Sequence, residues 1–528
     1  MPTECSINNP YLNSLVYEAA SVYSNNPPAA NVASGLLENL PSEEQRSLYL
    51  KPFHAAQVIE PLLSDVKPSL WTTVCKDDEL MRDLLSVLLR CEYQFTGAFH
   101  KDLLLEDMAS RRTDFCSPLL VNVLLAYACV CYPQFSNRVK YWDPTSLMYR
   151  FIAEAKRLWE LEVTVARITT IQAGILFCVF HNLCGLDEIG QTYRLKTVSL
   201  AYQLQIFDCI VKGQSERLQR GREFTAWAVY NWETLSASTL MQPPLIKKHP
   251  RWTLPNPSED PSWYGEVWVR YPLNHGLSPC YIGEVLRAKS QFRVITNEFC
   301  EAAYSKNSKM DVSLAYHFYE KLEQWCDSLP GPLTPKRIVL PGQFHIHMSY
   351  HHLLLTIFEP LSDAMAVEKP SPQQIVGSSK RNLQTLIRLY YLRHGFEATD
   401  LFIVIPLMVI GYDATNTIKE GISEKEIETL RSTLILIAYG LYYQRRSHYL
   451  AQALFRVIRG KMRPQEISLL RSSMALEKGG VDLEPEMSVA VRSRWPVSGV
   501  VKKHEDVKSH MLSNLVDSLE NGNVEESS

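Results

Sequence analysis

Hydrophobic residues recur at helical spacing along most of the chain, from about residue 46 to about residue 475. Ser117 followed by Pro118 has the residue types preferred at a helix N-cap and at the first helical position. The apolar residues that follow recur every three or four positions, as on one face of a helix. We find neither short strands alternating with turns nor a repeat of fixed period. The pattern predicts an all-α fold.

Further helix boundaries follow from the same local signals. Asp143 followed by Pro144 repeats the cap-and-proline pattern, and Gly185 suits the end of a helix that begins near Thr170. In the C-terminal half, the apolar pattern predicts helices over about 341–361, 376–396, 400–411 and 424–458.

Composition divides the chain into three parts. Residues 1–45 are rich in Asn, Ser and Pro, and we expect a polar linker or disordered lead-in. Residues 46–475 form the helical domain, whose Pro-rich stretch at about 241–280 is too long for a simple helix connection. We expect that stretch to pack across the surface or to join two helical halves. Residues 476–528 form a polar, acidic tail.

The charge balance narrows the function classes. The chain has 528 residues, of which 46% are hydrophobic, and its 54 basic and 57 acidic residues give a formal net charge of −3. This argues against binding nucleic acid through bulk positive charge. The twelve cysteines are scattered singly apart from Cys129 and Cys131, which point to opposite sides of a helix. We expect reduced, mostly buried thiols in an intracellular protein.

Neither a signal peptide nor a membrane span is expected. The first ten residues lack a basic region followed by an apolar stretch. The most apolar run, residues 401–412, would span about 18 Å as a helix, against a hydrocarbon core of about 30 Å. We expect this run to be a buried core segment.

The usual enzyme signatures are missing from the sequence. Residues 459–462 lack the upstream Gly and the following Ser or Thr of a phosphate loop, and no nucleophile elbow or dinucleotide fingerprint occurs. The acidic run at residues 77–79 has no second set of ligands in register, so a solvated helix start is the better interpretation. We expect no enzyme and name no catalytic residue.

The strongest candidate chemistry is a group of four histidines. They are His345, His347, His351 and His352. The spacing of His347 and His351 places two imidazoles on one helix face, as in zinc sites. A metalloprotease would need Glu where Met348 stands, and Glu359 would be a third ligand only if the helix bent. We therefore interpret these residues as hydrogen-bonded histidines of a core helix and name no metal site.

Short basic and amphipathic segments leave two questions open. Residues 247–251 and 502–504 suit either weak nuclear localisation elements or solvated loop charges. A short helix near the C-terminus would carry five apolar residues on one face, framed by acidic residues. These five are Met511, Leu512, Leu515, Val516 and Leu519. That face suits either an activation segment that folds on a partner or docking onto the protein's own core.

Several stretches together resemble the fungal-specific transcription factor domain, the regulatory domain of zinc-cluster transcription factors. Residues 95–103 resemble the aromatic-His segment that opens this domain, and residues 116–122 resemble its next helix. Its central helices, its Trp segment and its C-terminal half have counterparts at residues 168–173, 190–193, 226–230, 242–244, 322–325, 328–330, 350–361 and 389–396. The resemblance covers roughly residues 50–460, and the order of the pieces makes it specific.

The resemblance implies a helical regulatory module in a family that recognises DNA through an N-terminal zinc cluster of six cysteines. Only Cys5 precedes Cys75 here, so the first seventy residues cannot hold two zinc ions through six thiolates. We therefore expect no cofactor in this chain, with zinc only if a missing upstream segment carries the cluster. DNA would be reached indirectly or through that segment.

The leading hypothesis is a nuclear transcriptional regulator that acts through protein partners, such as a DNA-binding relative or a second copy, or through a small-molecule effector. Relatives of this kind commonly regulate metabolic gene clusters. We expect any effector pocket between the two helical halves, and we can name no residues for it. Two alternatives stay open: a helical scaffold unrelated to transcription, and a metal-dependent enzyme that uses the His345–His352 region.

Overall fold

The computed structural model describes nine segments of the chain. They are residues 9–18, 52–209, 213–272, 276–306, 310–362, 370–418, 423–475, 491–496 and 508–525. The longer helices are α5 (Asp78–Cys91), α7 (Lys101–Ser110), α8 (Pro118–Cys131), α9 (Leu147–Glu162), α10 (Ile168–Leu183), α11 (Asp187–Gln203), α12 (Glu216–Thr239), α13 (Ile282–Tyr304), α14 (Val312–Asp327), α15 (Pro341–Phe358), α16 (Pro372–His394), α17 (Val404–Thr417), α18 (Glu424–Gln444), α19 (Tyr449–Lys461), α20 (Pro464–Ala475) and α21 (Leu512–Glu525). The prediction of an all-α fold is confirmed.

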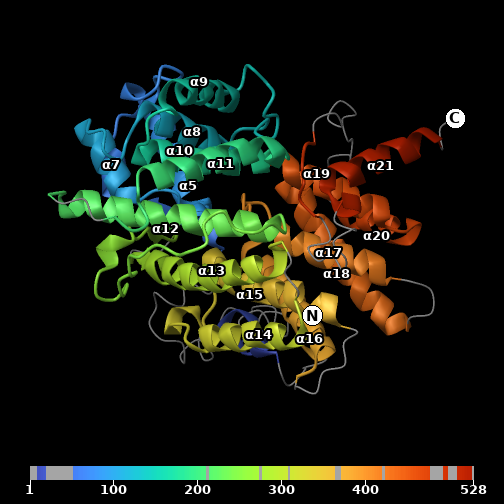
Figure 1. Ribbon diagram of the computed structural model, residues 1–528. Helices are drawn as coiled ribbons and strands as arrows, with labels where there is room; N and C mark the ends of the chain where they lie inside the picture. Colours follow the sequence, from blue (N-terminus) through green and yellow to red (C-terminus); the bar gives the residue numbers. More distant parts are fainter. Residues whose placement is uncertain are drawn as a thin grey trace.

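Short elements connect these helices. Two are the α-helices α4 (Pro61–Asp65) and α6 (Tyr93–Thr96). The 3-10 helices are η1 (Pro10–Asn13), η2 (Phe53–Ala55), η3 (Pro68–Leu70), η4 (Pro261–Trp263), η5 (Gly331–Leu333), η6 (Glu359–Leu361) and η9 (Lys508–His510). Figure 1 shows α7 to α11 at one end of the molecule and α17 to α21 at the other. Below the α7–α11 group in this view, α12 and α13 lie side by side.

The helix boundaries follow local signals, with one shift. Ser117 caps α8 by accepting a hydrogen bond from the Leu120 amide at 3.2 Å, as its sequence predicts. The predicted start at Asp143 is wrong, because the Asp143 carboxylate accepts hydrogen bonds from Thr145 in a turn. The side chain of Ser146 caps α9 instead. A suitable cap three residues later therefore displaced the boundary.

The helix expected over 424–458 is two helices. The chain breaks after α18, and the imidazole of His448 caps α19 by accepting from the Ala451 amide at 3.3 Å. The side chain of Gln444 donates to the carbonyls of Phe396 and Ala398, which fixes the end of α18. These buried tertiary bonds explain a break that the apolar pattern hides.

The sequence pattern did not reveal three short strands. Strands β1 (Gln57–Ile59), β2 (Trp268–Arg270) and β3 (Ser278–Pro279) form one antiparallel sheet in the order β1-β2-β3. Val58 pairs with Val269, and Val269 pairs with Ser278. The sheet joins the Pro-rich stretch to residues that lie about two hundred positions earlier, so local patterning could not reveal it.

The Pro-rich stretch packs across the helices on either side of it. Trp252 donates through its indole nitrogen to the Ile206 carbonyl at 2.9 Å and accepts from the Trp227 indole at 3.0 Å. One hydrophobic cluster contains buried residues from Tyr11 to Val516 and so runs through both helical halves. The two halves therefore share a core.

Both predicted polar termini contain packed segments. Within residues 1–45, Tyr11 is only 2% exposed and lies against α15. Within residues 476–528, Leu512 and Val516 of α21 are buried, and this helix packs on α19. Of the two readings left open for the C-terminal apolar face, the structure therefore adopts docking onto the core.

The apolar run at 401–412 is a buried core segment, as predicted, since Leu407, Met408 and Ile410 are shielded from solvent within α17. Among the described residues, we find no helix with both the length and the apolar character that a membrane crossing requires.

Candidate functional site

A cavity lies where the two helical halves meet. Its walls come from α6, from the facing sides of α10, α11 and α12, from the start of α17 with the residues before it, from α19 and from the tail segment 491–496. It is partly open to solvent, and its free volume is only about 70 Å³. Its described lining residues are Phe95, Cys178, Asn182, Asp187, Gln191, Trp232, Leu235, Ser236, Thr239, Leu240, Leu401, Val404, Ile405, Leu450, Ser493 and Trp495. That volume is well below the roughly 300–1,000 Å³ that is typical of small-molecule sites.

The lining is apolar and aromatic with a polar end. Phe95, Trp232 and Trp495 contribute three aromatic rings. Among the described lining residues there is neither Lys nor Arg, and Asp187 supplies the one carboxylate. Desolvation would therefore penalise an anionic ligand, and the nearby carboxylate would repel it.

Asp187 stands at the first turn of α11, where a carboxylate interacts favourably with the helix N-terminus. It is 8% exposed, and its carboxylate accepts from the Arg494 amide at 3.0 Å. Burial raises the pKa of Asp187 to about 6, and the hydrogen bonds from Arg494 and Ser493 oppose that rise. The carboxylate therefore helps to hold the tail segment beside the cavity.

The tail segment 491–496 is bonded to the turn between α10 and α11. The Arg492 amide donates to the Gly185 carbonyl at 3.0 Å, and the Glu188 amide donates to the Arg492 carbonyl at 3.1 Å. The second bond satisfies an N–H at the start of α11 that has no partner within the helix. Gly185 makes this turn with a φ of +66°, a conformation that favours glycine.

A second set of bonds ties the tail segment to α21. The Leu512 amide donates to the Trp495 carbonyl at 2.9 Å, and the Ser513 hydroxyl donates to the Ser493 carbonyl at 2.9 Å. Because α21 packs on α19, the segment is held from both sides of the cavity. Trp495 is accordingly 8% exposed.

A buried ion pair braces the cavity wall. Arg194 of α11 and Glu233 of α12 lie 2.6 Å apart, and their side chains are 3% and 1% exposed. Glu233 also accepts from the Leu245 amide at 2.9 Å, and Arg194 donates to Gln191, which lines the cavity. These bonds fix α11 against α12, so the two helices present a rigid wall.

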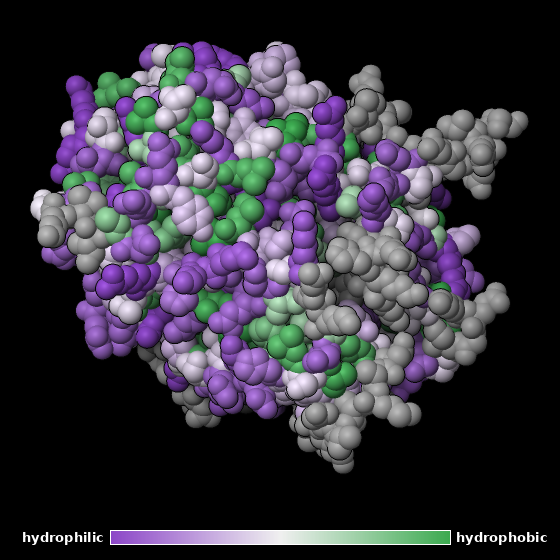
Figure 2. Space-filling view, viewed as in Figure 1, coloured by the Kyte–Doolittle hydropathy of each residue, from purple (hydrophilic) through white to green (hydrophobic). Residues whose placement is uncertain are grey.

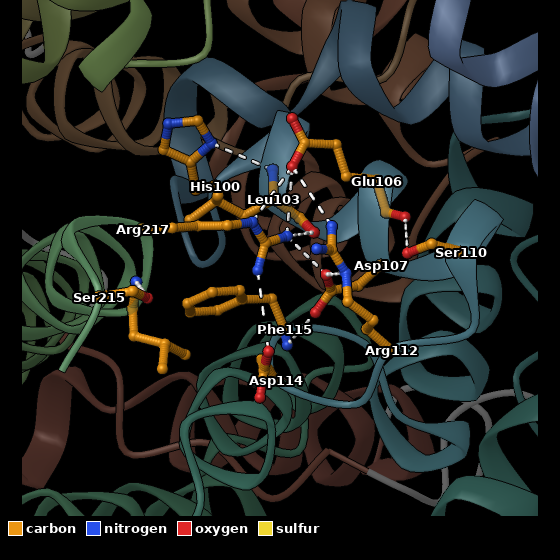
Figure 3. A network of polar contacts seen from close by, with 11 residues as sticks. His100, Leu103, Glu106, Asp107, Ser110, Arg112, Asp114, Phe115, Ser215 and Arg217 are labelled. Carbon is orange, nitrogen blue, oxygen red and sulfur yellow. Dashed lines mark hydrogen bonds and ion pairs between the residues drawn. The ribbon is translucent and has the colours of Figure 1, made fainter.

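The other end of α12 is anchored by the polar network in Figure 3. Arg217 forms ion pairs with Asp107 and Glu106 of α7, and its guanidinium lies over the Phe115 ring at 5.0 Å. The Asp107 carboxylate also accepts from the Phe115 amide at 2.7 Å. A Cβ on Gly221 would come within 2.0 Å of that ring, so only glycine fits there. The network positions α12.

The histidines of α15 are bound to the protein itself. His347 and His351 both contact the Tyr11 hydroxyl, at 3.1 and 2.9 Å, and His347 also bonds the Leu333 carbonyl at 2.7 Å. His345 bonds Asp400 at 2.8 Å. Burial lowers the pKa of His347 to about 4 and that of His351 to about 3, so both imidazoles are neutral near pH 7. They form a core network, as the sequence indicates.

The structure also places the other residues that the sequence analysis singled out. Glu359, the suggested third ligand, pairs with Lys380 at 2.9 Å instead of approaching the histidines. Across the described segments, no group of three or more His, Cys, Asp or Glu is arranged to hold a metal ion. Cys129 and Cys131 are buried free thiols whose pKa values burial raises. Asp77 caps α5 by accepting from the Leu80 amide.

Of the two basic clusters, the first lies on the described surface. Lys247 is exposed and pairs with Glu301, while His249 stacks on Trp227. The second cluster, residues 502–504, lies outside the described residues.

The sequence did not reveal the cavity residues. They are scattered between Phe95 and Trp495, and their apolar side chains have the same pattern as core residues. The one local signal was the Asp187-Glu188 pair after Gly185, which marks a helix start but not a site.

The family comparison matches less than half of the chain, in the part that carries α12. Residues 89–327 match the model of the fungal specific transcription factor domain. The match runs from the end of α5 to the end of α14, so it includes α10, α11 and α12 of the cavity wall. The walls formed by α17, α19 and the tail segment lie outside it.

Three curated relatives are similar to this chain. The nitrogen assimilation transcription factor nirA of Emericella nidulans is 24% identical over 353 residues, which is 62% of this chain and 39% of the relative. The corresponding factor nit-4 of Neurospora crassa is 23% identical, over 61% of this chain and 31% of the relative. The notoamide biosynthesis transcriptional activator notL' of Aspergillus versicolor is 24% identical, over 57% and 49%. The chain thus spans less than half of each relative. No solved structure matches it.

Proposed function

Because residues 89–327 are a fungal specific transcription factor domain, we propose that this chain is a transcriptional regulator whose helical body is the regulatory module. The domain match carries the proposal, and the three relatives, all named as transcription factors or activators, support it.

In this proposal the helical body does not contact DNA itself. The relatives are each more than twice the length of the part that this chain spans, so they hold further segments. We propose that DNA is contacted by a partner protein or by a segment outside the helical body. The regulator would act in the nucleus, on genes of a metabolic pathway, the kind of target that the relatives' names describe.

A tethering experiment tests the proposal. We would fuse the 528-residue chain to a heterologous DNA-binding domain and measure a reporter gene that carries the matching operator. The fusion is expected to change transcription relative to the DNA-binding domain alone. A fusion that is present in the nucleus and leaves transcription unchanged would overturn the proposal and favour the helical scaffold.

Two glycine substitutions show whether the folded module is responsible. Gly221→Ala in α12 places a Cβ 2.0 Å from the Phe115 ring and should abolish the effect. Gly377→Ala in α16 makes the same chemical change, but its Cβ meets nothing closer than Arg381 at 3.4 Å. This control should keep the effect, because alanine is the better helix former where space allows.

A further inference from the structure

We propose that four arginines on α18, α19 and α20 and at the end of α18 bind a short segment of a partner protein that is rich in Asp and Glu. They are Arg445, Arg456, Arg459 and Arg471, and we call them the arginine patch. These helices belong to the end of the molecule that α17 to α21 form in Figure 1. The inference adds a contact surface to the proposed regulatory function and rests on that function for its biological meaning.

The patch lies in a part of the chain whose charge is strongly one-sided. Residues 429–475 contain eight Lys and Arg residues against one acidic residue, Glu466, although the whole chain has a formal net charge of −3. The Glu466 side chain is 1% exposed and already pairs with Arg431 at 2.9 Å. Within the described segments, no ion pair or side-chain hydrogen bond engages the guanidinium groups of the patch. The patch therefore has no counter-charge of its own in these segments.

Aromatic rings hold part of the patch in place. The Arg445 guanidinium lies 4.1 Å from the centre of the Tyr442 ring and 5.8 Å from that of Phe455 on α19. Arg459 follows Phe455 by about one helical turn, so the two side chains share a face of α19. A guanidinium that lies over a ring still has N–H groups to donate to a carboxylate. The patch is therefore partly ordered before a partner binds.

The arginines are close enough to repel one another. Arg445, Arg456 and Arg459 are half-buried, and Arg471 is exposed. Burial, followed by the charges of Arg471 and Arg445, lowers the pKa of Arg459. Arg456 stands three positions before Arg459 on α19, a spacing that makes two side chains neighbours on a helix surface. Carboxylates placed among these cations would replace repulsion by attraction.

The limited extent of the patch favours a peptide segment over a nucleic acid. Glu424, Glu426 and Glu428 are exposed at the start of α18, and Asp517 is exposed on α21, which packs on α19. The helix α19 itself is about 20 Å long. A DNA duplex would follow a longer basic stripe, and its continuous phosphates would be repelled by these carboxylates. A short acidic segment can contact the patch alone.

A matched pair of labelled peptides tests the class of partner. Fluorescein-labelled decaglutamate carries carboxylates, and decaglutamine of the same length carries neutral amides. We expect the 528-residue chain to bind decaglutamate saturably in an anisotropy titration, and decaglutamine at least about tenfold more weakly. Equal affinities, or no saturable binding of decaglutamate, would overturn the proposal.

Paired arginine variants locate the peptide. Arg459→Gln with Arg471→Gln should weaken decaglutamate binding at least about tenfold, which is about 1.4 kcal/mol. Arg251→Gln with Arg381→Gln removes the same charge from two arginines that are exposed outside the patch, and it should leave the affinity unchanged. Equal losses in the two double variants would show attraction to net charge alone and would overturn the patch.

A single variant separates lost binding from a damaged fold. Arg471 is exposed, so Arg471→Gln should leave the thermal unfolding temperature unchanged while it weakens decaglutamate binding about threefold. An unlabelled duplex of twenty base pairs, added at the concentration of the peptide, should not displace decaglutamate. Unchanged peptide affinity in this variant, or displacement by the duplex, would overturn the assignment to an acidic protein segment.

The peptide titration is independent of the tethering experiment. An inactive nuclear fusion whose chain still binds decaglutamate through the patch would overturn the transcriptional role alone. An active fusion whose chain does not bind decaglutamate would overturn the patch alone.

Discussion

The histidine network of α15 and the cavity beside α12 differ in how completely their side chains are paired and packed. In the histidine network, His347 and His351 share the Tyr11 hydroxyl, and His345 is bound to Asp400. In the cavity, three aromatic rings and several aliphatic side chains surround empty space. The sequence draws attention to the first region because imidazoles are versatile ligands, but its buried polar groups stabilise the fold. The unfilled space lies in the region that no motif marks.

The largest expected effect concerns the ion pair that braces the cavity. Glu233→Ala leaves Arg194 buried without its counter-charge and should lower the free energy of unfolding by about 3–5 kcal/mol. Glu301→Ala, which breaks the exposed pair with Lys247, should change it by less than about 1 kcal/mol. Urea denaturation measures both variants. Similar losses would show that Glu233 does not brace the wall.

An identical truncation in the two regions compares their packing. Ile346 of α15 is 4% exposed, whereas Ile405 of α17 lines the cavity and is half-buried. Ile346→Ala should cost about 2–5 kcal/mol, because it opens a void in a filled core. Ile405→Ala should cost about 1 kcal/mol, since its neighbours already border empty space. Thermal unfolding compares the stability of the two variants. A larger loss of stability in Ile405→Ala than in Ile346→Ala would contradict this difference in packing.

The histidine network also predicts a dependence on pH. Burial, followed by the proximity of His347, lowers the pKa of His351 from 6.5 to about 3. The unfolded chain therefore takes up the proton first, and the stability contributed by a neutral His351 is lost as pH falls from about 6.5 toward 3. Relative to His351→Gln, the wild type should lose about 3 kcal/mol between about pH 7.5 and pH 4.5.

Chemical denaturation at several pH values measures the free energy of unfolding of the wild type and of His351→Gln. The variant is needed because Glu92 acts in the opposite sense: burial raises its pKa to about 8, so its contribution falls as pH rises from about 4.5 to 8. Parallel stability profiles for the wild type and His351→Gln would contradict a buried, neutral His351.

The smallest effect is expected at the hydroxyl that joins two of the histidines. Tyr11→Phe keeps the packing of the ring but removes the hydroxyl that His347 and His351 share, which should cost about 1–3 kcal/mol. The same change at Tyr202, which is 50% exposed, should stay within about 0.5 kcal/mol. If chemical denaturation shows no difference between the variants, the shared hydroxyl contributes nothing.

Local signals in the sequence predicted much of the fold. The Ser117-Pro118 pair fixes the start of α8, and Gly185 ends the segment of α10, because capping depends on neighbouring residues. Boundaries set by distant contacts were missed. The side chain of Gln444 bonds residues nearly fifty positions away, and strand β1 pairs with β2 across the Pro-rich stretch.

The candidate site was harder to predict than the fold. Its lining draws on Phe95, on α10 to α12, on α17 and on the tail segment, so it exists only after the two halves pack together. Apolar cavity residues and apolar core residues obey the same periodicity. The sequence could therefore place a pocket between the two halves but could not name its residues.

Zinc titration of the 528-residue chain tests most directly the central claim that the α15 histidines serve the fold. Isothermal titration calorimetry measures binding to the wild type and to a variant with both His347→Ala and His351→Ala. Because His345, His347 and His351 are already bound to Asp400, Leu333 and Tyr11, the account predicts no stoichiometric zinc binding by the wild type. Stoichiometric zinc binding that the double variant loses would contradict the claim.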